Sequence, residues 1–258
     1  MIKLVLTDLD GTLFLDDKTI SQYTTNVLKK IRKKGIKIGF CTGRATNSIH
    51  SHIKKISPDV VIANGGAEIF IDNELIYSCG FSAPEVQVLF DSVYRVCGSN
   101  AEITCDSEGE VYWNRTQNAQ TSLYSDKSIF HDFKSFNQTA MKICVQTWDE
   151  EKALAIASSL GLEKVNYIKF SDVPWYSFYK KEATKENAIK TLSKHMFIDL
   201  KDIVAFGDDF NDIGMLKLCG TGVAMENAIL QVKECADEIT LSNNQNGVAI
   251  WLEKRIAM

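Results

Sequence analysis

Two aspartates stand two residues apart near the start of the chain, directly after a short apolar run. Residues 4–6 are typical of a buried strand, and Asp8 and Asp10 follow them before Gly11 permits a turn. Side chains alternate between the two faces of a strand, so the two acids share a face if extended geometry persists to Asp10. Open α/β sheets bind ligands at the carboxyl ends of their strands, where these acids would lie. Alone, the same residues could equally form a solvated turn.

Two further polar sets follow strand-like runs later in the chain. These sets are Thr42 with Gly43, and Asp208 with Asn211 and Asp212. If the strands before them are central and parallel, both sets meet the first two aspartates at one edge of the sheet. Asp208 and Asp212 are four residues apart, so they are close if a helix has already begun there. Four carboxylates, from Asp8, Asp10, Asp208 and Asp212, are therefore expected to converge.

Such a group of carboxylates needs a compensating charge. Two unit charges 4 Å apart repel by about 4 kcal/mol at a surface-like dielectric constant. A ligand set made only of oxygen atoms favours a hard cation, and we expect Mg²⁺. The alternative is a set of separate acidic loops at the surface, each paired with a lysine.

Anion-binding groups accompany the acids. The backbone N–H groups at Gly43 and in the helix expected after it can face an anion, and Thr42 adds a hydroxyl donor. Lys185, at the start of a predicted helix, could complete a phosphate clamp. A metal, a carboxylate nucleophile, anion donors and a second acid together indicate phosphoryl transfer through an aspartyl phosphate.

The elements that must position these residues alternate between strand and helix at both ends of the chain, which predicts a parallel sheet with right-handed crossovers. After the first strand, strands are expected over residues 36–41, 60–63, 67–71, 74–78, 203–207, 222–224 and 239–241. Helices are expected over residues 20–34, from after 44 to about 56, and over 185–194, 213–218, 227–235 and 248–255.

The pattern changes between about residues 84 and 179, where several strands accompany only two helices. The helices are expected over 85–96 and 150–160, and the strands over 101–104, 110–113, 141–148, 165–170 and 175–179. This pattern is typical of an α+β sheet covered on one face. We therefore expect an α/β protein with a doubly wound parallel-sheet core, residues 1–83 and 180–258, and an inserted α+β domain, residues 84–179.

The composition limits the partners and the compartment. The chain of 258 residues has a formal net charge of -4, which gives no reason to expect nucleic acid or an anionic membrane as a partner. No apolar run approaches the roughly 20 residues of a membrane span. The seven cysteines lack zinc-site spacing, and no signal peptide is apparent, so we expect a cytoplasmic protein. Nothing demands assembly, and a monomer or weak dimer is expected.

Four motifs resemble those of the haloacid dehalogenase (HAD) superfamily, and they occur in that family's order. They are residues 8–13 (DLDGTL), residues 42–44 (TGR), Lys185 ahead of Ala188 and Ile189, and residues 207–212 (GDDFND). Residues 64–66 (NGG) and 243–249 (NNQNGVA) resemble the Cof-type phosphatase branch. The resemblance implies a Rossmann-like core with an α/β cap inserted between the second and third motifs.

The resemblance implies a role for each acid. Asp8 attacks phosphorus and binds Mg²⁺. Asp10 acts as general acid and then as general base, while its backbone carbonyl binds the metal. Asp208 is the remaining protein ligand to Mg²⁺, and Asp212 supports the metal through water or hydrogen bonds.

The resemblance also implies which residues hold the phosphoryl group. Thr42, Gly43 and Lys185 bind its oxygens, with help from the Leu9 backbone, and Asn211 contacts the phosphate.

We therefore expect a Mg²⁺-dependent phosphatase that acts on small phosphorylated metabolites, such as sugar phosphates or phosphorylated cofactors. One alternative is a phosphomutase of the same fold, which would return the phosphoryl group to a sugar. Another is a non-catalytic sensor of phosphometabolites, although sensing does not need Asp10. The sequence does not identify the substrate or the cap residues that select it.

Overall fold

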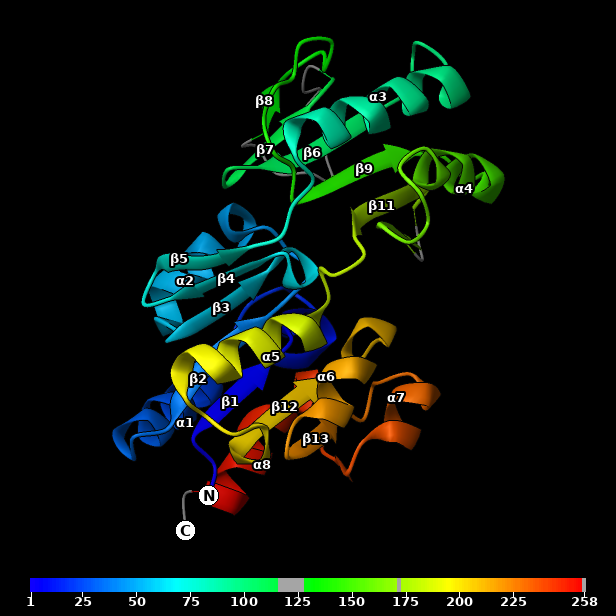
Figure 1. The fold of residues 1–258 in the computed structure, drawn as a ribbon. Helices are drawn as coiled ribbons and strands as arrows, with labels where there is room; N and C mark the ends of the chain where they lie inside the picture. Colours follow the sequence, from blue (N-terminus) through cyan, green and yellow to red (C-terminus); the bar gives the residue numbers. More distant parts are fainter. Residues whose placement is uncertain (116–127, 171–172, 257–258) are drawn as a thin grey trace. The chain divides into compact units, whose positions relative to one another are not determined.

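The computed structural model describes residues 1–115, 128–170 and 173–256, which divide into two compact units (Figure 1). The core unit comprises Met1–Arg44, Ile49–Tyr77 and Thr184–Met258, and the inserted unit comprises Ala45–Ser48 and Ser78–Ala183. The core unit is thus assembled from stretches of chain that lie on both sides of a long insertion. No described helix is both long and apolar enough to cross a membrane.

The core unit is built on an eight-stranded sheet with the order β14-β13-β12-β1-β2-β3-β4-β5. Neighbouring strands from β14 to β3 pair in parallel, and β4 pairs with β3 in the antiparallel direction. The strands are β1 (Leu4–Thr7), β2 (Lys37–Cys41), β3 (Val60–Ala63), β4 (Glu68–Ile71), β5 (Glu74–Ser78), β12 (Ile203–Gly207), β13 (Thr221–Ala224) and β14 (Glu238–Ile239). This arrangement confirms the expected α/β class with a parallel sheet.

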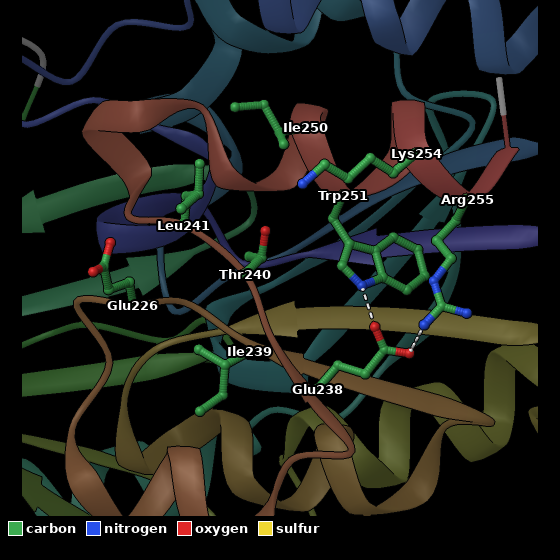
Figure 2. A pocket seen from close by; sticks show the side chains of 9 residues that line it. All are labelled: Glu226, Glu238, Ile239, Thr240, Leu241, Ile250, Trp251, Lys254 and Arg255. Atoms are coloured by element: carbon green, nitrogen blue, oxygen red, sulfur yellow. Dashed lines mark hydrogen bonds and ion pairs between the residues drawn. The ribbon is translucent and has the colours of Figure 1, made fainter. Parts of the chain in front are cut away.

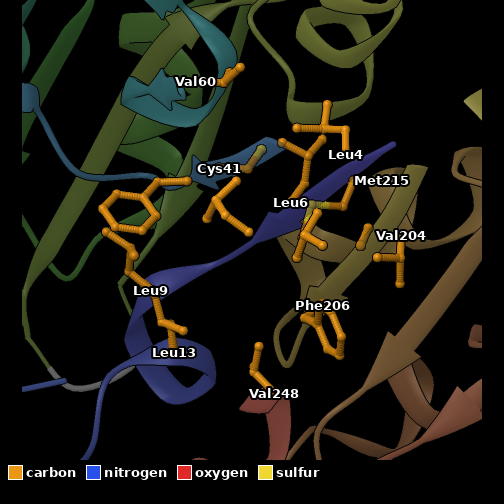
Figure 3. Close-up of a cluster of buried hydrophobic side chains, with 14 of the residues drawn as sticks. Leu4, Leu6, Leu9, Leu13, Cys41, Val60, Val204, Phe206, Met215 and Val248 are labelled. Atoms are coloured by element: carbon orange, nitrogen blue, oxygen red, sulfur yellow. The ribbon is translucent and has the colours of Figure 1, made fainter. Parts of the chain in front are cut away.

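Helices of the core unit connect and cover these strands. They are α1 (Gln22–Lys33), α2 (His50–Ile56), α5 (Lys185–Met196), α6 (Ile213–Leu218), α7 (Leu230–Cys235) and α8 (Gly247–Ile256). Helix α1 packs against α8, and α5 packs against α6. All residues of β1 are buried, as expected for a strand covered on both faces. Its Leu4 and Leu6 lie in a continuous apolar cluster with Val204 and Phe206 of β12 (Figure 3).

Local sequence signals set the limits of the helices that matter here. Ser21 caps α1, because its side chain accepts a hydrogen bond from the backbone N–H of Thr24. The chain leaves that helix through Gly35, whose φ of +80° suits glycine. Thr184 caps α5 in the same way by accepting from the N–H of Asn187, which places Lys185 in the first turn.

The inserted unit contains a second sheet with the order β10-β11-β9-β6-β7-β8. Its strands are β6 (Ile103–Ser107), β7 (Glu110–Trp113), β8 (Ile129–Phe130), β9 (Lys142–Gln146), β10 (Val165–Lys169) and β11 (Trp175–Lys180), and its helices are α3 (Ala83–Cys97) and α4 (Glu150–Ser158). Ile143 and Val145 share an apolar cluster with residues of both helices. Strand alternation places Lys142 on the opposite face, where its ammonium lies 2.6 Å from the buried carboxylate of Asp106.

Candidate active site

Three carboxylates come together at the carboxyl ends of two neighbouring strands. Strands β1 and β12 pair in parallel with Thr7 opposite Phe206, so the residues that follow each strand reach the same edge. Asp8, Asp208 and Asp212 each offer an oxygen within 4.8 Å of the others. The convergence that we expected of these three acids is therefore present in the structure.

Lys185 joins two of these acids. Its Nζ donates to Asp8 Oδ1 and to Asp212 Oδ1, each at 2.6 Å, and its side chain is only 1% exposed. Burial disfavours the charged form of this lysine, but the two carboxylates outweigh burial and raise the pKa of Lys185. Burial raises the pKa of Asp8 well above its usual value, although Lys185 acts in the opposite direction.

Asp212 organises the turn that follows β12. Its Oδ2 accepts hydrogen bonds from the backbone N–H groups of Asp208, at 2.9 Å, and Asp209, at 3.1 Å. Its Oδ1 accepts from Lys185, and the side chain is fully buried. Both oxygens therefore already hold protein groups in place, which fits a supporting residue better than a direct metal ligand.

The carboxylate of Asp208 contacts the loop Leu9–Leu13, which follows Asp8. Thr12 Oγ1 donates to Asp208 Oδ1 at 2.6 Å, and a Cβ built on Gly11 would lie 2.2 Å from Asp208 Oδ2. The φ of Gly11 is +73°, so both the backbone conformation and the lack of space require glycine. Burial, helped by the charges of Asp212 and Asp209 and opposed by Thr12, raises the pKa of Asp208 to about 6.

The group of Asp8, Asp208 and Asp212, here called the acid cluster, fits a hard divalent cation. Among the described residues, the hydrogen bonds to Asp8 and Asp208 reach only Oδ1 of each carboxylate, so Oδ2 of each accepts none from the protein. Three clustered carboxylates exceed the single positive charge of Lys185, and a divalent ion would offset the remainder. A donor set of carboxylate oxygens suits Mg²⁺.

The side chain of Asp10 does not belong to this cluster, so the expected convergence of four carboxylates is wrong for this residue. Strand β1 ends at Thr7, and the alternation of a strand therefore does not continue to Asp10. Its carboxylate instead binds Arg44 and Lys18. Burial alone would raise the pKa of Asp10, but Arg44, with Lys18, outweighs burial and lowers it. The sequence reasoning missed both of these partners.

Several of the predicted phosphate-binding residues follow the carboxyl ends of β1, β2 and β12, which are neighbouring strands of the core sheet. Thr42 follows β2, is buried, and its N–H donates to the carbonyl of Ile62 on β3. A Cβ built on Gly43 would lie 4.0 Å from Asn211 Nδ2, so these two residues are neighbours. The carbonyl of Leu9 accepts from the N–H of Phe14 and closes the loop after Asp8.

The chain beyond Gly43 differs from the expectation. The predicted helix begins as a 3₁₀ turn, Thr46–Ile49, before the regular α2.

Two asparagines to which the sequence analysis gave no role hold the loop after Asp8 by hydrogen bonds. Asn227 Nδ2 donates to the carbonyl of Gly11 at 2.7 Å, and its Oδ1 accepts from the backbone N–H of Asn243. The buried Asn243 Nδ2 donates to the carbonyl of Phe14. Asn243 opens the 243–249 motif, but nothing in the sequence indicated which groups its amide would bind.

A separate cavity of about 390 Å³ lies on the core unit and contains none of the predicted site residues (Figure 2). Its lining includes Trp251, Glu238, Lys254 and Arg255. Glu238 accepts from Trp251 Nε1 at 2.8 Å and also pairs with Arg255, so these polar groups satisfy one another. The chemistry therefore centres on the acid cluster rather than on this cavity.

Comparisons with known proteins identify hydrolases and phosphatases as relatives of this chain. The family model of the haloacid dehalogenase-like hydrolases matches residues 5–252. A Bacillus subtilis protein named 5-amino-6-(5-phospho-D-ribitylamino)uracil phosphatase YitU is 27% identical over 266 residues, which cover 99% of this chain and 98% of that protein.

Solved structures agree in fold. A haloacid dehalogenase-like hydrolase from Bacteroides thetaiotaomicron has a TM-score of 0.86 at 24% identity, with 98% of this chain and 99% of that chain covered. BT1666 from the same organism, described among the phosphatases of the HAD superfamily, has a TM-score of 0.82 at 25% identity, with 98% and 95% covered.

These matches confirm the expected family, the fold class and the enzyme class, a phosphatase. Because the family model spans nearly the whole chain, the protein belongs to the haloacid dehalogenase-like hydrolases.

Proposed function

We propose that the protein hydrolyses small phosphomonoesters through an aspartyl phosphate on Asp8, with Mg²⁺ as its cofactor. The observation that carries this proposal is the arrangement around Asp8. One of its oxygens is held by Lys185 at 2.6 Å, while the other, in the same cluster as Asp208, accepts no hydrogen bond from described residues. A carboxylate that is oriented at one oxygen and available at the other is suited to nucleophilic attack.

The reaction has two halves. Asp8 Oδ2 forms a bond to phosphorus as the bond to the leaving oxygen breaks, and Asp10 gives that oxygen a proton. Water then attacks the phosphorus, the bond to Asp8 breaks, and Asp10 takes the proton of the water. Bound Mg²⁺ would supply positive charge where Asp8 and the phosphate repel each other, with Asp8, Asp208 and the Asp10 carbonyl as its protein ligands.

The phosphoryl oxygens need donors that hold them in place. We place this role with the Thr42 hydroxyl, the Gly43 and Leu9 backbone N–H groups, Lys185 and Asn211. The proximity of Gly43 and Asn211 supports this set, because the two residues come from different strand ends. Asp212 acts indirectly, by orienting Lys185 and the backbone at Asp208.

We propose that the substrates are sugar phosphates or phosphorylated cofactors and that residues 84–179 form a cap that selects among them. The name of the Bacillus subtilis relative supports this class, since its substrate carries a phosphorylated ribityl chain. We also propose that the protein is cytoplasmic, which its seven free cysteines support.

The proposal is tested by measuring phosphate release from a panel of phosphorylated metabolites, with Mg²⁺ and with EDTA. Asp8→Asn should abolish Mg²⁺-dependent release, whereas Asp209→Asn, a change at an exposed neighbouring acid, should leave it within a few fold. Full activity of Asp8→Asn would contradict the mechanism. Conversion of a sugar phosphate into its isomer without phosphate release would instead identify a phosphomutase, and binding without turnover would identify a sensor.

A further inference from the structure

The carboxylate of Asp10 is held at both oxygens by cationic side chains. Arg44 Nε donates to Oδ2 at 2.5 Å, and Arg44 Nη2 donates to Oδ1 at 2.7 Å. Lys18 Nζ donates to Oδ1 at 2.9 Å. The contact with Arg44 is the bidentate arrangement in which a guanidinium fixes the orientation of a carboxylate as well as its charge.

Arg44 is itself fixed by its surroundings. Its backbone N–H donates to Thr42 Oγ1 at 3.1 Å, and its carbonyl accepts from the N–H of Asn64 at 2.9 Å. Its guanidinium lies 5.8 Å from the centre of the Phe14 ring. The side chain of Arg44 is 33% exposed, whereas that of Lys18 is 56% exposed. Arg44 is therefore the ordered partner of Asp10, and Lys18 is a peripheral one.

The hydrogen-bond capacity of Asp10 limits what it can do in this arrangement. A carboxylate has about four acceptor positions, and the three donors leave one of them, on Oδ2. That position can accept one proton from water.

We propose that Arg44 is a positioning residue that holds Asp10 ready to act as the base in the second half of the reaction. This inference rests on the proposed aspartyl-phosphate mechanism. The attacking water forms its bond to phosphorus, the bond between phosphorus and Asp8 breaks, and the proton of the water passes to Asp10 Oδ2. The neutralised Asp10 then leaves Arg44 and becomes the acid that protonates the next leaving oxygen.

The test is a rapid-mixing experiment with p-nitrophenyl phosphate, whose leaving group needs little help from an acid. Arg44→Gln should slow the hydrolysis of the aspartyl phosphate roughly tenfold, less than the loss of about 10²–10⁴-fold that removal of a general base itself would cause. Phosphorylated enzyme should then accumulate, and a burst of about one p-nitrophenolate per enzyme should precede the steady state. Lys18→Gln is the matched control and should give little or no burst, because Lys18 is peripheral.

A double-mutant cycle separates positioning from substrate binding. If Arg44 acts through Asp10, Arg44→Gln should change turnover by less than about twofold in an Asp10→Asn background. Arg44→Lys should restore only part of the rate, because an ammonium cannot make the bidentate contact. A raised KM without a burst, with the full effect of Arg44→Gln retained in Asp10→Asn, would overturn the inference and make Arg44 a substrate-binding residue.

Failure of the proposed role of Arg44 can be distinguished from failure of the proposed aspartyl-phosphate mechanism. Retained activity in Asp8→Asn, or absence of label on Asp8 after quenching with a ³²P-labelled substrate, would refute the aspartyl-phosphate mechanism itself. A wild-type time course for Arg44→Gln, in a protein that Asp8→Asn inactivates, would refute only the role of Arg44. Melting temperatures of all variants show that each has folded.

Discussion

Asp8 and Lys185 are separated by 177 positions in the chain, yet their side chains meet at 2.6 Å in a buried hydrogen bond. The same ammonium donates to Asp212 in the turn that follows β12. One lysine thus links the residue after β1, the start of α5 and the turn after β12. Its removal should affect both the stability and the chemistry of the core unit.

Replacing Lys185 by methionine would leave Asp8 and Asp212 buried without their cation. We expect a loss of about 3–5 kcal/mol in the free energy of unfolding, together with loss of phosphatase activity. Urea titrations and phosphate release measure the two effects. Lys190→Met on the same helix is the control, because its 3.9 Å pair with Glu186 is exposed and should contribute no more than about 0.5 kcal/mol. Equal losses of stability and activity in Lys185→Met and Lys190→Met would contradict the prediction.

Magnesium should stabilise the folded protein, because the ion would bind the clustered carboxylates only when they are brought together. A concentration 100-fold above the dissociation constant adds about 2.7 kcal/mol, or a rise of about 5 °C in melting temperature. Asp208→Asn should remove the magnesium-induced rise, and Asp209→Asn should retain it. Equal shifts in the two variants, measured by thermal unfolding, would place the ion elsewhere.

Gly11→Ala should disturb the site as well as the backbone. The φ of +73° carries a penalty of about 1–2 kcal/mol for alanine, and its Cβ would also displace the Asp208 carboxylate. Gly35→Ala provides a matched control, since its φ is +80° but no atom lies within 4 Å of the added Cβ. Both variants should lose stability in urea, and only Gly11→Ala should lose phosphate release. Equal activities would show that the contact with Asp208 is dispensable.

The pair of Lys142 and Asp106 should stabilise the inserted unit only while both partners are present. Their side chains are 11% and 6% exposed and lie 2.6 Å apart. Asp106→Leu alone removes the carboxylate that compensates the buried charge of Lys142 and should cost about 3–5 kcal/mol, whereas adding Lys142→Met should recover much of that loss. Calorimetry of the single and double variants measures the difference, and a double variant no more stable than the single one would contradict the prediction.

Protonation of Asp202 should lower the free energy of unfolding at acid pH. The hydrogen bond from Lys3, with the N-terminal amine, lowers its pKa below the ordinary value of 3.8. The folded state therefore binds the proton more weakly than the unfolded state. The stabilisation is fully present above pH 3.8 and is lost as the pH falls through the lower folded value. Asp202→Asn should be less stable than the wild type in urea at pH 7, and this difference should shrink progressively below pH 3.8.

The alternating fold of the core was predictable because apolar runs, helix caps and terminating glycines all agree along those segments. The predicted ends of helices and strands that were wrong depend on contacts with residues distant in the chain. Residues 227–235 have helical spacing, but α7 begins only at Leu230, because the backbone at Ile229 is extended and its N–H donates to the carbonyl of Asp208. The strand Ile129–Phe130 was missed, since two residues paired to β7 carry no period of their own.

Part of the site was predictable for the same reason. Asp8 and Asp208 directly follow strands whose parallel pairing could be inferred, so their convergence followed from topology alone. Asp10 could not be placed, because its direction depends on the turn at Gly11 and on a guanidinium 34 positions away. Thr12 was likewise unremarkable in the sequence, and only the folded loop brings its hydroxyl to Asp208.

The pairing of β1 with β12 has a consequence for folding during synthesis on the ribosome. Thr7 emerges early, but its neighbour Phe206 is translated almost two hundred codons later. Until then, the backbone N–H and C=O groups of Leu4–Thr7 that will pair with β12 lack their partners, and Asp8 lacks Asp208 and Asp212. Such long-range closure slows folding and favours intermediates. The three-carboxylate cluster therefore cannot assemble before Asp212 has been translated.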